Sequence, residues 1–179
     1  MHYLAIVSVI WALSFGLIGQ ALSEVDPVFA ATMRLGIAGL AFLPFLRWSK
    51  IPHGSHLKLI GCGAVQFGIM YVCYMMAFQI VPGQSHLVAL FSILTPLYVV
   101  LINDLRKREF HPKYLYAALL AIAGAATIKA RAGSMDSLWI AFGLMLIAGI
   151  ALSFGQVYYR DWKREHAEVK DHQIFALLY

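Results

Sequence analysis

The sequence predicts an all-α membrane protein, a multi-pass bundle of helices. Hydrophobic residues make up 61% of the 179-residue chain and charged residues only 13%, whereas soluble domains are about 45–50% apolar and about 25% charged. The apolar residues also gather in blocks close to the roughly 20 residues that a membrane-spanning helix needs. Finally, basic residues alternate between successive loops, as expected for a chain that crosses a membrane repeatedly.

Six apolar blocks define the predicted helices. The block at 114–130 is the shortest, and it relies on Lys113, Lys129 and Arg131 to reach from its ends to the lipid headgroups. A seventh apolar run, Ile174–Tyr179, begins a partial helix over 172–179. The predicted spanning helices cover residues 3–22, 27–46, 59–81, 85–103, 114–130 and 138–159.

The distribution of Lys and Arg predicts the orientation. Eleven of the 14 basic residues lie in the loops after the second, fourth and sixth helices. The positive-inside rule therefore places the N-terminus in the cytoplasm, and we expect the chain to lie in a bacterial inner membrane with the lipid bilayer as a partner. The net charge of +5 is spread over short loops. It gives no reason to expect nucleic-acid binding.

A short repeat suggests two related halves. The residues Ala12–Gly16 read Ala-Leu-Ser-Phe-Gly, and the same five residues return at Ala151–Gly155. A chance match of this kind is expected in about one chain in twenty of such composition. The copies fall in the first and sixth helices, an odd number of crossings apart, so they run in opposite directions. This is the signature of an inverted repeat, with residues 132–137 as the linker between halves at 1–131 and 138–179.

Arg34 is the only formal charge well inside a predicted span. It lies about 10 Å below the outer end of its helix at 1.5 Å per residue. An arginine at mid-bilayer costs at least about 2.5–3.5 kcal/mol, so it should face a partner or a wet cavity. Two interpretations remain open: a contact to a substrate carboxylate or phosphate, or a structural arginine that snorkels or bonds backbone carbonyls.

Further cavity candidates are polar, aromatic or sulfur-bearing residues at mid-depth. In the fourth helix Pro96 predicts a kink, and kinked polar segments often form transporter sites; a static kink is the alternative. Tyr74 lies too deep to be an interface anchor. In the fifth helix Ala117, Ala121 and Ala125 form a ladder that predicts close helix packing. The cavity candidates besides Arg34 are Trp11, Ser14, Phe15, Gln66, Met70, Tyr74, Ser92, Thr95 and Pro96.

These residues resemble the EamA-type members of the drug/metabolite transporter superfamily. The resemblance is carried by Trp11–Phe15, Arg34, Ser92–Leu97 and Arg108-Glu109. It implies ten helices in two inverted five-helix repeats around a central cavity, with the fifth helices at the repeat interface. It also implies that Trp11, Ser14, Arg34, Tyr74 and Thr95 line that cavity.

The chain departs from this pattern in two ways. Ile150 stands where the second repeat commonly has the counterpart of Trp11. The sequence also ends at Tyr179, so it would hold one five-helix repeat, the first helix of the second repeat and the start of the next. We favour a fragment of a ten-helix protein over a half that pairs with a second subunit.

The leading interpretation is a secondary transporter that moves a small metabolite (an amino acid, amine, carboxylate or similar) by alternating access. No nucleotide-binding motif is present, and we expect no enzyme activity and no cofactor. A small-multidrug-type exporter acting as an oligomer is weaker, because its first helix normally holds a glutamate where this chain has Ser14. An intramembrane enzyme would need ligands beyond His53 and His56, so no metal is expected. A membrane assembly protein would lack a polar cavity.

Overall fold

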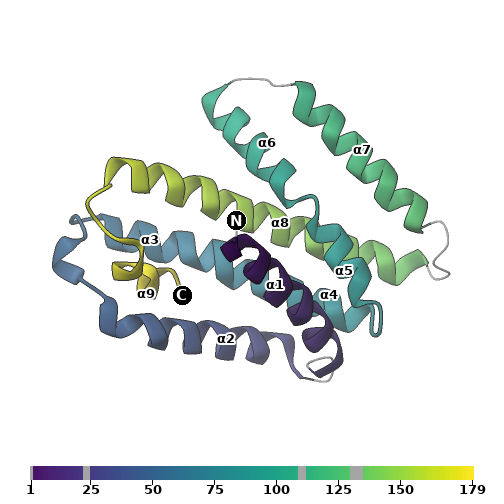
Figure 1. Ribbon diagram of the computed structural model, residues 1–179, viewed down its shortest axis with the longest axis horizontal. Helices are drawn as coiled ribbons and strands as arrows, with labels where there is room; N and C mark the ends of the chain where they lie inside the picture. The colour runs from purple at the N-terminus through teal and green to yellow at the C-terminus, as the bar shows by residue number, and fades with distance from the viewer. Residues whose placement is uncertain (1, 22–24, 109–111, 130–134) are drawn as a thin grey trace.

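The computed structural model describes residues 2–21, 25–108, 112–129 and 135–179, and within these ranges the chain is helical with no strand. Figure 1 shows α2, the α3–α4 segment and α8 running along the long axis, with α4 packed against both α2 and α8. The helices are α1 (His2–Ala21), α2 (Pro27–Phe42), α3 (Ser55–Gly63), α4 (Met70–Ile80), α5 (Ser85–Ser92), α6 (Thr95–Lys107), α7 (Pro112–Lys129), α8 (Met135–Glu165) and α9 (Phe175–Leu178). Short turns at η1 (Leu43–Phe45), η2 (Trp48–Lys50) and η4 (Asp171–Gln173) are 3₁₀-helical, and η3 (Ala64–Ile69) is a π-helical turn.

The chain is a multi-pass membrane protein. Within the described residues, four helical stretches are long and apolar enough to span: Pro27–Phe45, Ser55–Ile80, His86–Lys107 and Ser137–Glu165, while α1 holds a shorter apolar stretch at Ala5–Ile18. Large apolar side chains face outward, such as Leu17 on α1 and Leu40 on α2, which are 65% and 68% exposed. Contiguous apolar surface of this extent is rare on soluble monomers and is what lipid contact requires.

The start of α2 follows local capping rules. The Asp26 carboxylate accepts the Phe29 backbone N–H at 2.8 Å, and Pro27 occupies the first turn of α2, where its missing N–H costs nothing. The third predicted helix begins at Ser55, four residues earlier than expected, directly after Gly54 at φ 88°.

The sixth predicted helix runs to Glu165, past the end of the apolar block. Its polar extension is held by contacts that hydropathy does not reveal. Asp161 pairs with Arg106 of α6 at 3.0 Å, and Arg160 donates to the Asn103 side chain at 2.8 Å. These contacts join the ends of α6 and α8 on the side where the basic loops gather.

The fourth predicted helix is broken, which confirms the kink expected at Pro96. Ser92 ends α5 and Thr95 starts α6, with Ile93 and Leu94 between them. Pro96 has no N–H to donate back to the preceding turn, so the α-helical ladder is interrupted there.

Within the part of the chain that the structure describes, two apolar clusters hold the bundle together. One gathers α4, α5 and α8 through residues such as Phe78, Val88 and Met145. The other gathers α3, the end of α8 and α9, and it includes the fully buried Leu59 and Ile174. The second cluster seats α9 between α2 and α3, as Figure 1 shows.

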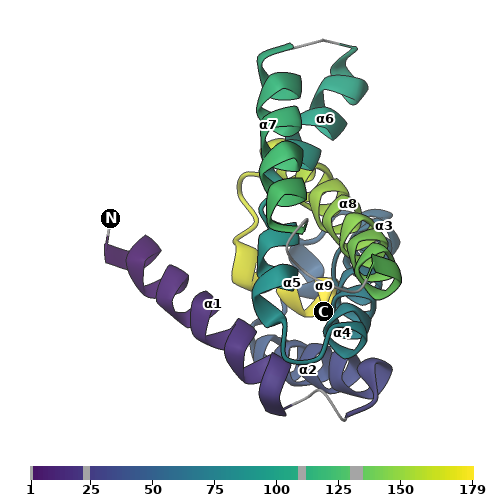
Figure 2. The ribbon, with the colours of Figure 1, turned by 90° about the vertical axis from the view of Figure 1, so that its right-hand side faces the viewer.

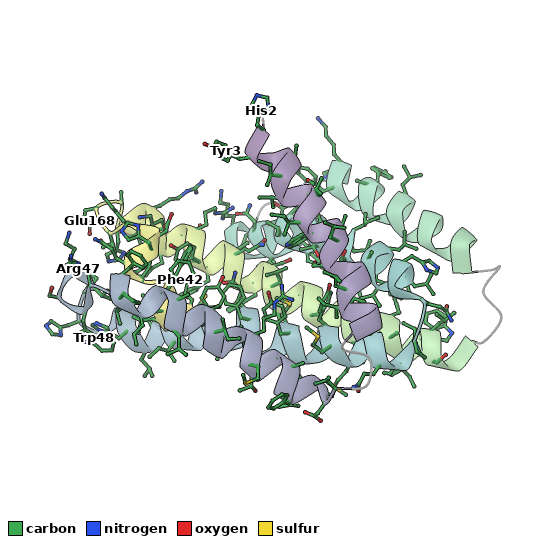
Figure 3. The ribbon with its side chains drawn as sticks, turned by 60° about the horizontal axis from the view of Figure 1, so that its bottom comes forward. His2, Tyr3, Phe42, Arg47, Trp48 and Glu168 are labelled. Carbon is green, nitrogen blue, oxygen red and sulfur yellow. The ribbon has the colours of Figure 1, made fainter. Side chains whose placement is uncertain are left out.

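One end of the molecule carries the turns between the helices of the second cluster. Figure 3 shows Arg47, Trp48 and Glu168 gathered at this end, whereas His2 and Tyr3 lie at the tip of α1. The Arg47 N–H donates to the Gln173 carbonyl at 3.1 Å, and the Trp162 indole N–H donates to the Ser55 hydroxyl at 3.2 Å. Figure 2 shows α1 leaning away from the other helices toward its N-terminus.

The predicted packing ladder lies on α7. Ala117 is exposed, and the side chains of Ala121 and Ala125 lie outside the described residues. Helix α7 contacts α6. The interface role of the ladder stays a prediction, as does the boundary at 132–137, of which residues 132–134 also lie outside the described residues.

Candidate substrate cavity

A cavity of about 700 Å³ lies between helices of both predicted halves. Helices α1, α2, α4, α5 and α6 contribute from the first half, and α8 contributes from the second. Ligand cavities in proteins are commonly about 300–1,000 Å³ and mostly apolar, with a few placed polar groups. The size and the lining fit a small metabolite.

The structure brings eight of the ten predicted cavity residues together around this space. They come from four of the predicted helices, so their meeting depends on the tertiary fold. These residues are Trp11, Ser14, Arg34, Met70, Tyr74, Ser92, Thr95 and Pro96. Their contact with a substrate stays a prediction.

Arg34 is held against an aromatic wall. Its guanidinium carbon lies 4.8 Å from the centroid of the Tyr71 ring, a cation–π contact, which contributes about 0.5–2 kcal/mol depending on desolvation. Tyr71 and Tyr74 meet edge to face, with ring centroids 6.4 Å apart. Among the residues that line the cavity, Arg34 carries the only formal charge. The cavity is therefore positive at one wall and otherwise neutral.

The break between α5 and α6 forms a second wall. The Ser92 hydroxyl donates to the Ala89 carbonyl at 2.6 Å, within its own helix. The Thr95 carbonyl accepts a hydrogen bond at 3.2 Å from Ser153, a fully buried serine of α8. The hydroxyl of Ser153 thus fastens α8 to the break.

Helix α8 closes the cavity because small residues let it approach its neighbours. A Cβ added to Gly149 would lie 2.6 Å from the Tyr98 ring, so only glycine permits the observed approach of α6. The same face of α8 presents Met145, Leu152 and Gln156 to the cavity.

Two predicted residues are not among the lining residues. Gln66 is buried, and its side chain packs under Gly155 of α8 and accepts a weak contact from the Cys62 thiol at 3.9 Å. The prediction treated Gln66, Met70 and Tyr74 as one α-helical face. Gln66 lies in the π-helical turn η3. A π-helical turn holds one residue more than an α-helical turn, so Gln66 is rotated away from that face. The side chain of Phe15 lies outside the described residues.

The sequence-based set omitted the α8 wall and Tyr71. The repeat offered a partial signal, since Leu152 and Ser153 belong to its second copy. However, the two copies have different surroundings: Ser14 lines the cavity and donates to the Trp11 carbonyl at 2.7 Å, whereas Ser153 is buried outside it. Assigning the cavity-lining role of Ser14 to Ser153 on the basis of the repeat would therefore have selected the wrong residue of α8.

Comparison with known proteins identifies the family. The EamA-like transporter family matches residues 1–130. The chain belongs to this family. No solved structure matches the chain significantly.

Curated relatives align with the whole chain. A "Probable biotin transporter" of Pseudomonas aeruginosa is 38% identical over 181 residues, covering 100% of this chain and 62% of that protein. A "Biotin transporter" of Salmonella typhimurium is 37% identical and that of Escherichia coli K12 is 36% identical, each over 185 residues, 100% of this chain and 59% of the relative. The chain thus spans about three-fifths of the length of these relatives.

Proposed function

We propose that this chain forms part of a secondary transporter that carries a small carboxylate, with biotin as the first candidate, across a bacterial inner membrane by alternating access. The substrate binds in the cavity between α2, α4, α6 and α8. Its carboxylate lies against Arg34, and its apolar part lies against the aromatic and aliphatic walls. The N-terminus faces the cytoplasm.

This proposal rests on the absence of an acidic partner for Arg34 among the described residues. Its guanidinium faces the cavity with only the Tyr71 ring as a recorded partner, and no carboxylate of the described residues pairs with it. A guanidinium has five N–H donors in a fork that matches a carboxylate. An anionic ligand would satisfy these donors, whereas an amine would be repelled by the same charge.

The relatives support the choice of substrate. Biotin combines a carboxylate, a short alkyl chain and a ring system, and a cavity of about 700 Å³ with one positive wall is suited to such a molecule. Because the lining residues come from both predicted halves, relative movement of α8 against the helices of the first half would expose the cavity to one side or the other.

Uptake of labelled biotin by cells that lack their own transporter and express this protein tests the proposal. Arg34→Ala should lower apparent affinity about 10- to 150-fold, because a hydrogen-bonded charge contributes about 1.5–3 kcal/mol. Arg34→Lys should fall between the two, since lysine keeps the charge without the fork.

Arg164→Ala is the matched control, because Arg164 is exposed at the end of α8 and outside the cavity. Its uptake should equal that of the parent protein. If Arg34→Ala transports biotin with unchanged affinity, Arg34 does not bind the carboxylate. If the parent protein transports neither biotin nor any other small carboxylate, the proposed function is wrong.

A further inference from the structure

The polar side chains of the cavity differ in whether they already have partners. The hydroxyls of Ser14 and Ser92 donate to carbonyls of their own helices at 2.7 and 2.6 Å, so neither has a free proton to offer a ligand. In contrast, the Gln156 amide and the Thr95 hydroxyl line the cavity with no hydrogen bond recorded for their side chains within the described part of the chain. These two groups are available for recognition.

Gln156 lies on the α8 wall, and Thr95 lies on the adjoining wall formed by the break between α5 and α6. The Ser153 hydroxyl reaches the Thr95 carbonyl at 3.2 Å. Gln156 follows Ser153 by three residues on α8, and residues three apart are neighbours on a helix surface. The amide of Gln156 is therefore placed one turn further along α8 from the contact that joins α8 to Thr95.

Gln156 lies at a different level along the helices from Tyr71, the ring that contacts Arg34. Gly155, next to Gln156, packs directly on Gln66: a Cβ added to it would lie 2.6 Å from Gln66 Cγ. Gln66 precedes Tyr71 by five residues on the α3–α4 segment, which corresponds to about 7 Å along a helix axis. The lining also includes the apolar side chains of Met70, Val99 and Leu152.

We propose that Gln156 determines specificity by binding an uncharged amide or urea group at the end of the substrate opposite its carboxylate. A glutamine amide offers both a donor and an acceptor, so it can pair in two places with a group that offers the same. The Thr95 hydroxyl supplies a third contact. A substrate then needs two polar ends separated by an apolar stretch. This inference rests on the proposed function, since Arg34 defines the other end.

A competition experiment on labelled biotin uptake tests it with three unlabelled compounds. Desthiobiotin keeps the carboxylate and the cyclic urea, octanoate keeps only the carboxylate, and biotinamide keeps only the urea end unchanged. The parent protein should prefer desthiobiotin over octanoate and biotin over biotinamide. Sites built to hydrogen-bond a ligand group discriminate strongly against analogues that lack it.

Gln156→Leu keeps the size of the side chain and removes both hydrogen-bonding atoms. The preference for desthiobiotin over octanoate should fall about 10- to 100-fold, while the preference for biotin over biotinamide is retained. Arg34→Ala should give the reverse pattern. Gln156→Asn, which keeps a shortened amide, should give an intermediate loss and guards against misfolding of the leucine variant. Gln84→Ala, at a glutamine outside the cavity, should change neither preference.

An unchanged preference for desthiobiotin in folded Gln156→Leu would overturn the inference. If the parent protein takes up no biotin, the proposed substrate fails, and the inference is then measured on the purified protein by thermal stabilisation with ureidohexanoate and octanoate. Selective stabilisation by the ureido acid that disappears in Gln156→Leu supports the role of Gln156. Equal effects of the two acids, or selectivity that survives Gln156→Leu, refute it.

Discussion

The close packing of Gly149 against the Tyr98 ring allows a quantitative prediction about the stability of an alanine variant. A Cβ at this position would lie 2.6 Å from Tyr98 Cε2 and 2.8 Å from Cδ2, whereas a Cβ at Gly143 of the same helix would meet nothing within 4 Å. Both substitutions by alanine gain the same helix propensity, about 0.8–1 kcal/mol. Only Gly149→Ala adds an overpacking cost, typically about 1–3 kcal/mol. Because propensity cancels, Gly149→Ala should be less stable than Gly143→Ala by about 1–3 kcal/mol.

Thermal unfolding of the two purified variants in detergent measures this difference. The parent protein should lie between them or close to Gly149→Ala. The proposed biotin uptake should fall in Gly149→Ala alone, because α8 carries Leu152 and Gln156 and would be displaced from α6. Equal stability of the two alanine variants would refute the close approach of α8 to Tyr98.

A double-mutant cycle assigns the cost to the ring itself. Tyr98→Leu removes the atoms that the added methyl group would meet and leaves a cavity at a residue that is buried. In the Tyr98→Leu background, Gly149→Ala should cost less than in the parent protein. A coupling energy near zero would show that the strain lies elsewhere, since direct contacts normally couple by about 0.5–3 kcal/mol.

Two further predictions use matched positions in the chain. Ser153→Ala removes a buried hydrogen bond between α8 and the Thr95 carbonyl, so it should lower the free energy of unfolding by about 0.5–1.5 kcal/mol. Ser14→Ala should have a smaller effect, because the Ser14 hydroxyl bonds within α1. Equal effects of the two substitutions would contradict the tertiary role of Ser153. The second prediction concerns the orientation and uses a variant without native cysteines. Gln84→Cys should react with a membrane-impermeant maleimide in intact cells, and Lys50→Cys should react only after lysis, as the positive-inside rule requires. The opposite labelling pattern would show that the proposed orientation is wrong.

Most of the residues that line the cavity in the first half could be predicted from their type and their depth within a predicted span. Arg34 stood out because a charge inside an apolar block is costly, and Pro96 because it cannot continue a helical ladder. Both arguments are local, and both residues line the cavity. Gln66 was predicted to line the cavity because we assumed α-helical periodicity across residues 64–69, which form a π-helical turn. The sequence of these residues does not indicate the additional residue in that turn.

The amino-acid sequence by itself determined the class of the protein, because a bilayer requires long apolar segments. Within the described residues, four of the six predicted spans fall in helical stretches that are long and apolar enough to cross a membrane, and the direction of the chain stays a prediction from the loop charges. The sequence also marked the first half of the cavity through isolated polar residues. Only the tertiary structure decided which face of α8 completes that cavity. The two copies of Ala-Leu-Ser-Phe-Gly are identical, yet Ser14 faces the cavity and Ser153 is buried against the break before α6. Neighbouring helices, and not the residues themselves, fix how each copy is rotated.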